Sequence, residues 1–296
     1  MIRRIFLFLF VNCLVIAAIS IVLSLLNIKP FLISNGLNLQ SLLIFCFIWG
    51  MVGAFISLAL SRKIAKWMMR IQLITLNSSQ ADLYQMIARL SKDANLPAIP
   101  EVGIFDSPQM NAFATGPTRK RSLVAVSTAL LTHMEKHELE AVLAHEISHI
   151  SNGDMVTMTL IQGVVNAFVM FLARVFAYAL TMTGRSNHQR SSHMSYFFFT
   201  FLFELVFMIF GSMLICTFSK WREFRADRES AILTRKEYMI AALEKLRFHQ
   251  KGARYHSKNA LNALMISTPR KKNILRNLFA THPPIEKRIQ RLREMG

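Results

Sequence analysis

Four long apolar stretches restrict this chain to the membrane proteins before any other feature is considered. They run from about Ile5 to Leu26, Leu39 to Leu60, Val156 to Met182 and Tyr196 to Phe218. A helix needs about 20 apolar residues to cross a hydrocarbon core of roughly 30 Å, and each stretch supplies them. Buried helices of soluble domains are usually shorter than this. The sequence therefore predicts an integral membrane protein with four hydrophobic helices.

Basic residues predict how these helices are oriented. Most of the basic residues that flank the apolar stretches lie on the same predicted side of the membrane as the N-terminus. They are Arg3, Arg4, Arg62, Lys63, Lys66, Arg70, Lys220, Arg222 and Arg225. Because cytoplasmic loops are rich in Lys and Arg, we expect both termini and the segment between the second and third stretches in the cytoplasm. The first stretch is longer than the roughly 7–15 apolar residues of a signal peptide, so we expect a retained anchor.

The net charge of +18 would suit a nucleic-acid-binding protein, but no nucleic-acid motif accompanies it. The basic residues lie largely beside the membrane, where attraction to anionic lipid explains them. Membrane lipid is therefore an expected partner and nucleic acid is not. The basic and apolar segment 62–74 suits either a helix in the membrane interface or an exposed linker. Cys13, Cys46 and Cys216 lie inside apolar stretches and are expected to be small buried residues.

The apolar stretches divide the chain into four parts. Residues 1–61 hold the first two membrane helices, 62–155 the first part of a cytoplasmic catalytic domain, 156–219 the other two membrane helices, and 220–296 the second part of that domain. Neither soluble part is large enough to promise an independent core, so we expect the two to pack together.

Pattern and turn residues predict helices around a small sheet in the soluble parts. A helix is expected over 81–96, strands over 101–107, 111–116 and 123–131, and one continuous helix over 220–248. The last helix is expected after THPP, with one apolar face made of Ile285, Ile289 and Leu292. The fold class is therefore α+β and mainly helical.

Local signals predict the ends of the helix that lies between the sheet and the third apolar stretch. Thr132 with Glu135 is a capping-box pair, which predicts a start at Thr132. Gly153 is the expected end, and Asp154 the expected N-cap of the third membrane helix.

His145, Glu146 and His149 form an H-E-x-x-H motif in that helix. Residues four apart share one helix face, so both imidazoles can reach a single metal ion. Glu146 projects beside that face, where it can accept a proton from a water that the metal activates. A solvated helix with incidental histidines is the alternative. The segment 133–137 also has two histidines four apart, but a methionine stands where the base should be.

A catalytic zinc ion needs a third protein ligand. The extended form of the motif fails, because Asn152 and Met155 stand where it requires Gly and His. A glutamate on a later helix is the next option. EFRAD supplies Glu223, with Asp227 one turn beyond to hold the second nitrogen of a ligand histidine. From spacing alone, a surface charge pattern with the neighbouring arginines explains this pair better.

HEISHISNGDMVTMTLIQGVVNAF, EFRADRESA, NAFATG and THPPIEKRI closely resemble segments of the HtpX-type bacterial membrane metalloproteases, gluzincins related to the CAAX prenyl proteases. The resemblance extends over nearly the whole chain. It implies a zincin-like catalytic domain with one Zn²⁺ per chain, held by His145, His149 and Glu223, and Glu146 as general base. It also implies a bacterial cytoplasmic (inner) membrane location and cleavage of misfolded or damaged membrane proteins at the cytoplasmic side, in stress-related quality control.

The resemblance also implies roles for residues outside the motif. The HPP element suggests His282 as a catalytic oxyanion donor, with Pro283 and Pro284 fixing its backbone. An ordinary helix-entry residue is the alternative. NAFATG resembles an edge strand to which an extended substrate adds through main-chain hydrogen bonds. Asn111 and Ala112 would then bind substrate near the metal, whereas a structural turn is the alternative.

Two charged residues, Arg174 and Glu204, stand inside the third and fourth apolar stretches. At about 1.5 Å per residue, each lies about 12 Å from the outer end of its stretch. We expect them to pair, because isolated charges inside a membrane are costly. Snorkelling of the Arg174 side chain to the interface is the alternative.

Two other classes of function fit the residues less well. A zinc transporter would place its histidines and acids within the apolar stretches, whereas His145, His149 and Glu223 lie outside them. A catalytically silent scaffold would be expected to lose Glu146 or a ligand. The leading interpretation is a membrane-anchored zinc endopeptidase that acts on membrane-protein or peptide substrates close to the lipid surface.

Overall fold

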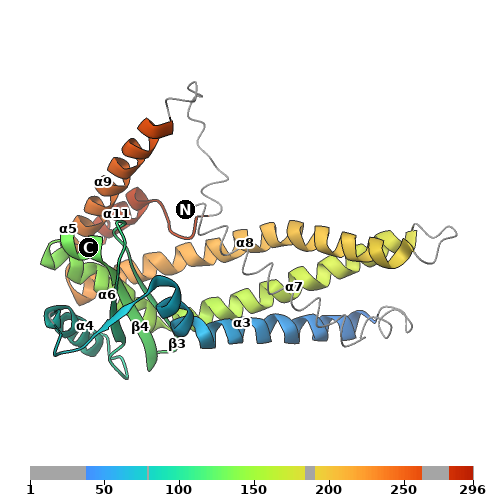
Figure 1. Cartoon of the computed structure of the whole chain (residues 1–296), viewed down its shortest axis with the longest axis horizontal. Helices are drawn as coiled ribbons and strands as arrows, with labels where there is room; N and C mark the ends of the chain where they lie inside the picture. Colours follow the sequence, from blue (N-terminus) through green and yellow to red (C-terminus); the bar gives the residue numbers. More distant parts are fainter. Residues whose placement is uncertain (1–37, 79, 184–190, 262–279, 296) are drawn as a thin grey trace. The chain divides into compact units, whose positions relative to one another are not determined.

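A computed structural model describes residues 38–78, 80–183, 191–261 and 280–295 (Figure 1). The chain forms two compact units. The membrane unit comprises residues up to Ser57 and Thr159–Ile215, and the sheet unit comprises Leu58–Met158 and the residues from Cys216 onward. The first predicted apolar stretch, with Cys13, lies outside the described residues. The four-part division of the chain made from the sequence remains a prediction.

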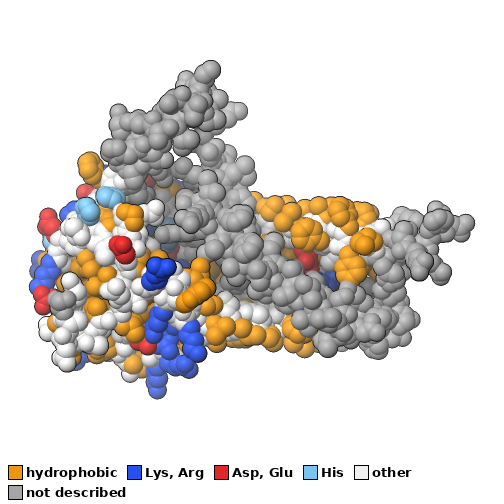
Figure 2. Space-filling model, in the orientation of Figure 1, with side chains coloured by type: hydrophobic (Ala, Val, Ile, Leu, Met, Phe, Trp, Pro, Cys, Tyr) orange, Lys and Arg blue, Asp and Glu red, His pale blue; other side chains and the backbone are white. Residues whose placement is uncertain are grey.

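Three long helices run through the membrane unit: α3 (Leu39–Met69), α7 (Asp154–Thr183) and α8 (Ser191–Leu233). Each is long and apolar enough to cross a membrane, and no other helix in the described part of the chain is. These helices contain the second, third and fourth predicted stretches. Many of the side chains visible along these helices are hydrophobic (Figure 2), as expected for helices that face lipid. The chain is therefore a membrane protein.

Small residues let α3 and α7 approach closely. A Cβ atom on Gly50 would lie 2.7 Å from the carbonyl oxygen of Gly163, so a larger residue would force the two helices apart. Leu42 and Cys46 of α3 pack on Met170 of α7 in the same contact. Close backbone approach of this kind is a common way in which membrane helices associate.

Arg174 of α7 and Glu204 of α8 form a buried ion pair in the membrane unit. The Arg174 Nη1 atom donates to Glu204 Oε1 at 2.8 Å and to the Met170 carbonyl at 2.9 Å. The side chains are 7% and 5% exposed. The predicted pairing is confirmed, and snorkelling of Arg174 is excluded. Cys46 and Cys216 are buried free thiols, as expected.

A four-stranded sheet lies at the centre of the sheet unit. Its strands are β1 (Gln72–Ile74), β2 (Glu101–Phe105), β3 (Ala112–Thr118) and β4 (Arg121–Ser127), in the order β1-β2-β4-β3. The β2–β4 pair is parallel and the other two pairs are antiparallel. Strand β3 pairs only with β4, so it is an edge strand. Strand β1 was not predicted, because three residues are too few to show an alternating pattern.

Helices pack on this sheet and on one another. They are α4 (Ala81–Asp93), α5 (Thr128–His133), α6 (Lys136–Asn152), α9 (Lys236–Leu261) and α11 (Ile285–Arg293). Val124 of β4 belongs to one buried cluster with Ile87 of α4 and Leu143 of α6. Ile289 and Leu292 of α11 are buried with Leu243 of α9, which confirms the predicted apolar face. The mainly helical α+β class is confirmed.

Two predicted boundaries before α6 are wrong. The strand predicted over 123–131 ends at Ser127, because the Ser127 hydroxyl accepts from the Leu130 amide and so caps α5. Thr132 lies inside α5 and does not start the next helix. The capping box of α6 is formed instead by Glu135 and Glu138. The observed capping box therefore starts three residues after the predicted one, with Glu135 as the N-cap residue and not Thr132.

The end of α6 is as predicted, but the start of α7 is not. Gly153 ends α6 in the left-handed region, with φ of 67°. Its carbonyl accepts from Val156 and Thr157, so Gly153 takes the N-cap position that was predicted for Asp154. Asp154 is the first residue of α7, and its side chain bonds His149.

Two further segments differ from the prediction. Residues 62–74 form neither an interface helix nor a linker, because α3 continues to Met69 and β1 follows. Arg62 and Lys66 hold this end of α3 to Glu101 of β2, at 3.2 and 2.6 Å. The helix predicted over 220–248 breaks between α8 and α9, where Arg235 accepts the first bonds of α9. No Gly or Pro marks that break in the sequence.

Candidate metal centre

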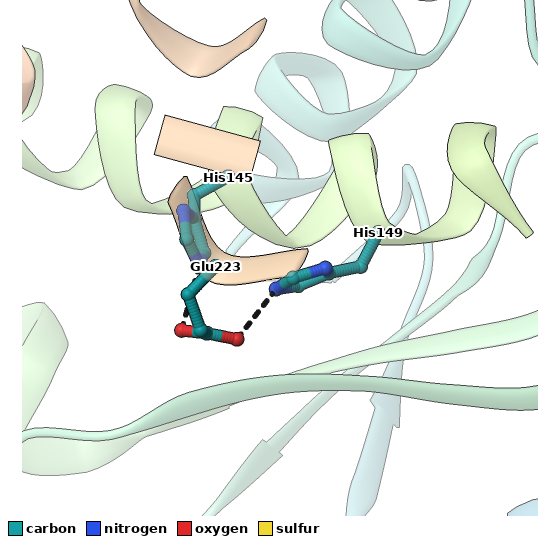
Figure 3. A group of neighbouring side chains, drawn as sticks. All are labelled: His145, His149 and Glu223. Carbon is teal, nitrogen blue, oxygen red and sulfur yellow. Dashed lines mark ion pairs between the residues drawn. The ribbon is translucent and has the colours of Figure 1, made fainter. Parts of the chain in front are cut away.

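Helix α6 places His145 and His149 one turn apart on one buried face (Figure 3). Their side chains are 7% and 8% exposed. The ring centroids are 4.7 Å apart and the rings are nearly perpendicular, at 85°. Two imidazoles at this spacing can approach one metal ion from two directions.

Glu223 of α8 completes a group of three potential ligands (Figure 3). Its side chain is fully buried, and its two oxygens lie 3.2 Å from His149 Nε2 and 3.6 Å from His145 Nε2. One ligand atom from each residue lies within 4.8 Å of the other two. It is the one such group among the described residues. The sequence alone left Glu223 open, and the structure brings it to the histidine pair.

The second nitrogen of each histidine faces another carboxylate. Asp154 Oδ2 lies 2.6 Å from His149 Nδ1, and Asp227 Oδ1 lies 3.0 Å from His145 Nδ1. Both Nε2 atoms therefore turn toward Glu223, whose Oε1 is buried without a hydrogen-bond partner among the described residues. Because each Nδ1 already faces a carboxylate, a neutral ring turns the lone pair of Nε2 toward Glu223, and a proton or a metal cation between them removes that repulsion. These donors therefore fit a metal cation, and nitrogen with carboxylate oxygen is a common ligand set for zinc.

The raised pKa of His145 also indicates that the site favours a cation. Burial alone would lower the pKa of His145, but the carboxylates of Asp227 and Glu223 raise it to about 9. The carboxylates thus favour a cation at the ring. The same preference would favour a bound metal ion over a proton once an ion is present.

Arg288 of α11 holds Asp227 in place. The guanidinium forms a two-pronged contact, with Nε to Oδ2 at 2.8 Å and Nη2 to Oδ1 at 2.5 Å. Both residues are buried. Asp227 in turn faces His145, so α11 supports the candidate ligand His145 through Arg288 and Asp227. The sequence did not predict this role for Arg288, although its place between Ile285 and Ile289 on the apolar face of α11 was a usable signal.

Glu146 lies on α6 next to His145. It is half-buried, and no hydrogen bond or ion pair joins its carboxylate to a described residue, although its charge acts on Arg288. An acid beside the ligands with an uncommitted carboxylate can take part in proton transfer.

His282 lies against the candidate metal ligand. Its Nδ1 is 2.5 Å from Glu223 Oε2, and its side chain is 58% exposed. This contact places it at the site, rather than only at the entry to α11. Its role as an oxyanion donor remains a prediction.

Asn111 and Ala112 lie where β3 begins at the sheet edge. The main chain of Asn111 is bonded on both sides to Ser127: its amide donates to the Ser127 hydroxyl, and its carbonyl accepts from the Ser127 amide, both at 2.9 Å. Ala112 is the first residue of β3 and stands opposite Val126. Their contact with a substrate remains a prediction.

The histidines of the segment 133–137 do not join the site. His133 lies on α5 with Nδ1 2.8 Å from the Ala129 carbonyl, and His137 lies on α6 beside Glu135. His133 ends one helix and His137 lies in the first turn of the next, so the two do not share a helix face.

Membrane-spanning helices joined to a unit with an H-E-x-x-H pair and a distant glutamate define a membrane metallopeptidase. The model of Peptidase family M48 matches residues 77–296. The chain belongs to this family, and the resemblance seen in the sequence is confirmed.

Two similar proteins show how far the likeness extends. The chain is 42% identical to "Protease HtpX homolog" of Bacillus subtilis (strain 168), over 99% of each chain. It is 44% identical to "Protease HtpX" of Tolumonas auensis, again over 99% of each. Among solved structures, the crystal structure of S. mikatae Ste24p is similar with a TM-score of 0.60, 17% identity, and coverage of 98% of this chain and 67% of that one. At that identity the likeness concerns the fold alone.

Proposed function

We propose that this chain is a zinc-dependent endopeptidase of the bacterial cytoplasmic membrane. It would cleave membrane-protein or peptide substrates, misfolded or damaged membrane proteins among them, at the cytoplasmic side. The observation that carries the proposal is the convergence of His145 and His149 with the fully buried Glu223. Membership of Peptidase family M48 supports it.

His145, His149 and Glu223 would hold one zinc ion per chain. When bound, zinc supplies a Lewis acid that lowers the pKa of a water to about 7 and stabilises negative charge on the substrate carbonyl oxygen. Three protein ligands leave one position open for this chemistry.

Glu146 would act as the general base. Its uncommitted carboxylate is next to His145 on α6, so it can accept the proton of the attacking water and then deliver it to the leaving amine. His282 would assist by donating to the oxyanion. Because its Nδ1 faces Glu223, Nε2 is the nitrogen left to face the substrate, and it can donate there only when both ring nitrogens carry a proton.

The outer edge of β3 would bind the substrate as an added strand. The Ser127 amide bonds the Asn111 carbonyl, which fixes the alternation of main-chain groups along β3. The amides and carbonyls of Ala112 and Ala114 therefore point away from β4 and are available to an extended peptide. Because the amide and carbonyl of Asn111 already bond Ser127, Asn111 would contact the substrate through its side chain.

The metal would lie close to the membrane surface. Helix α7 is a candidate membrane span and starts at Asp154, five residues after His149 in the sequence. The basic residues that flank the spans predict that this side is cytoplasmic. Substrate segments that leave the lipid would therefore meet the site directly.

A single substitution tests the chemistry. The wild type and Glu146→Gln are purified under chelation, supplied with zinc, and compared for zinc content and for cleavage of an unfolded protein. We expect equal zinc binding and no cleavage by the variant. Glu140→Gln is the matched control, because Glu140 lies on the same helix and instead pairs with Arg89; it should cleave normally. Wild-type cleavage by Glu146→Gln would remove Glu146 from the mechanism.

A further inference from the structure

We infer that residues 152–154 form a joint that positions the metal ligands, with Asp154 acting through His149 and Asn152 acting through α8. This inference deepens the proposed function and rests on it. It concerns residues that neither the motif nor the family match assigns to the site.

The joint is built where α6 passes into α7. Gly153 ends α6 with φ of 67°, a conformation that favours glycine. The chain turns there, and the next residue, Asp154, comes back toward α6. Its carboxylate reaches His149 Nδ1 at 2.6 Å, and Asp154 is 6% exposed. With so little solvent available, the imidazole is the principal partner of that carboxylate oxygen.

This contact decides which nitrogen of His149 faces the metal site. An ionised carboxylate can only accept, so the proton of the ring is held on Nδ1. The lone pair of Nε2 then points to the side where Glu223 lies, 3.2 Å away. A carboxylate behind a ligand imidazole fixes the ring orientation and makes the ligand more basic. Asp154 is therefore a positioning residue for His149.

Asn152, the last residue of α6, bonds the end of that helix to α8. Its Nδ2 donates to Glu229 Oε2 at 2.5 Å, and its Oδ1 accepts from Arg225 Nη2. Arg225 Nε also donates to Glu229, at 3.3 Å, which closes the cluster. Arg225 and Glu229 lie on α8, in the turns that follow Glu223. The end of the histidine helix is thus tied to the helix that supplies the third ligand.

The contact of Asp154 with His149 and the bonds of Asn152 to α8 both connect the metal ligands to apolar helices. Asp154 is the first residue of a candidate membrane span, and Glu223 lies on α8, the helix that contains another. The orientation of His149 and the position of Glu223 are therefore both set by helices that enter the membrane. This explains why the chain places its metal-binding motif immediately before an apolar helix: the first turn of that helix supplies the support for a ligand.

The test measures zinc affinity of the full chain in detergent by competition with a chromophoric chelator. Asp154→Ala should weaken zinc binding by about 10- to 100-fold, the range found when such supporting carboxylates are lost. Asp154→Asn keeps an acceptor of the same shape but no charge, so it should lose less. It also keeps the test valid if the alanine variant does not fold. Asn152→Ala should weaken zinc binding through the loss of both bonds to α8.

Glu138→Ala is the matched control. Glu138 is another buried acid on α6, bonded to Lys245 at 2.7 Å and to the Glu135 amide at 2.8 Å, and it touches no candidate ligand. It should lower the melting temperature and leave zinc affinity within about twofold of the wild type. The absorption spectrum of bound Co²⁺ provides a second readout, since it should change in the Asp154 variants and not in Glu138→Ala.

Three results would overturn the inference. They are wild-type zinc affinity in folded Asp154→Ala, wild-type affinity in Asn152→Ala, or an equal loss of affinity in Glu138→Ala. Failure of the proposed function has a different signature, because His149→Ala would then bind zinc as tightly as the wild type.

Discussion

Replacement of Arg288 by alanine is the most informative perturbation of the site's support. Arg288 and Asp227 are 8% and 2% exposed and share two hydrogen bonds, at 2.8 and 2.5 Å. Arg288→Ala would leave the Asp227 carboxylate buried near the Glu223 carboxylate, with only His145 as a partner. Breaking a buried ion pair by removing one member costs about 3–5 kcal/mol. We expect the free energy of unfolding of the sheet unit to fall by that amount, and zinc affinity to fall with it.

The assay is denaturant unfolding of the metal-free protein in detergent, followed by zinc titration. Arg291→Ala is the control, because Arg291 lies on the same helix and rests on the Phe224 ring, 4.7 Å from its centroid. It should cost less than about 1 kcal/mol. Arg288→Lys keeps the charge but not the two-pronged geometry, so it should fall between the two. If Arg288→Ala is no more destabilising than Arg291→Ala, the support described for Asp227 is wrong.

Three further predictions follow from the geometry. Charge reversal of Arg174 or Glu204 alone should reduce the yield of folded protein, since it places two like charges together where even one unpaired charge costs about 2.5–3.5 kcal/mol. Reversal of both should restore the yield, and no restoration would argue against the pair. Because the pKa of His145 is raised to about 9, the stability that its proton provides is complete below about pH 6.5 and is lost as pH rises through 9. Zinc must displace that proton, so its affinity should rise about tenfold per pH unit from 6.5 to 9 and then level off, and a flat profile would contradict this. Gly50→Val should lower the melting temperature, because its side chain would meet the Gly163 carbonyl.

Features that depend on neighbouring residues were predictable from the sequence. The apolar stretches at α3, α7 and α8 are long enough to be recognised by length alone. His145 and His149 share a face because they are four residues apart on one helix, whatever the rest of the chain does. Gly153 marked the end of α6 because few other residues adopt its backbone conformation.

Features that depend on distant contacts were not predictable in the same way. Glu223 reaches the histidines only because α8 returns beside α6, and spacing alone favoured a surface charge pattern. Arg288 looked like one more basic residue of a basic segment until α11 packed it against Asp227. Asp154 carried a familiar helix-capping signal, but the turn at the end of α6 directs its carboxylate to His149 instead.

The proposed mechanism requires one zinc ion that is held jointly by two histidines of α6 and one glutamate of α8. Anomalous diffraction at the zinc edge, on crystals of the active protein, measures this directly. We expect one zinc per chain, about 2.0–2.2 Å from Nε2 of His145, Nε2 of His149 and an oxygen of Glu223. A zinc ion bound elsewhere, or an active preparation without bound metal, would contradict it.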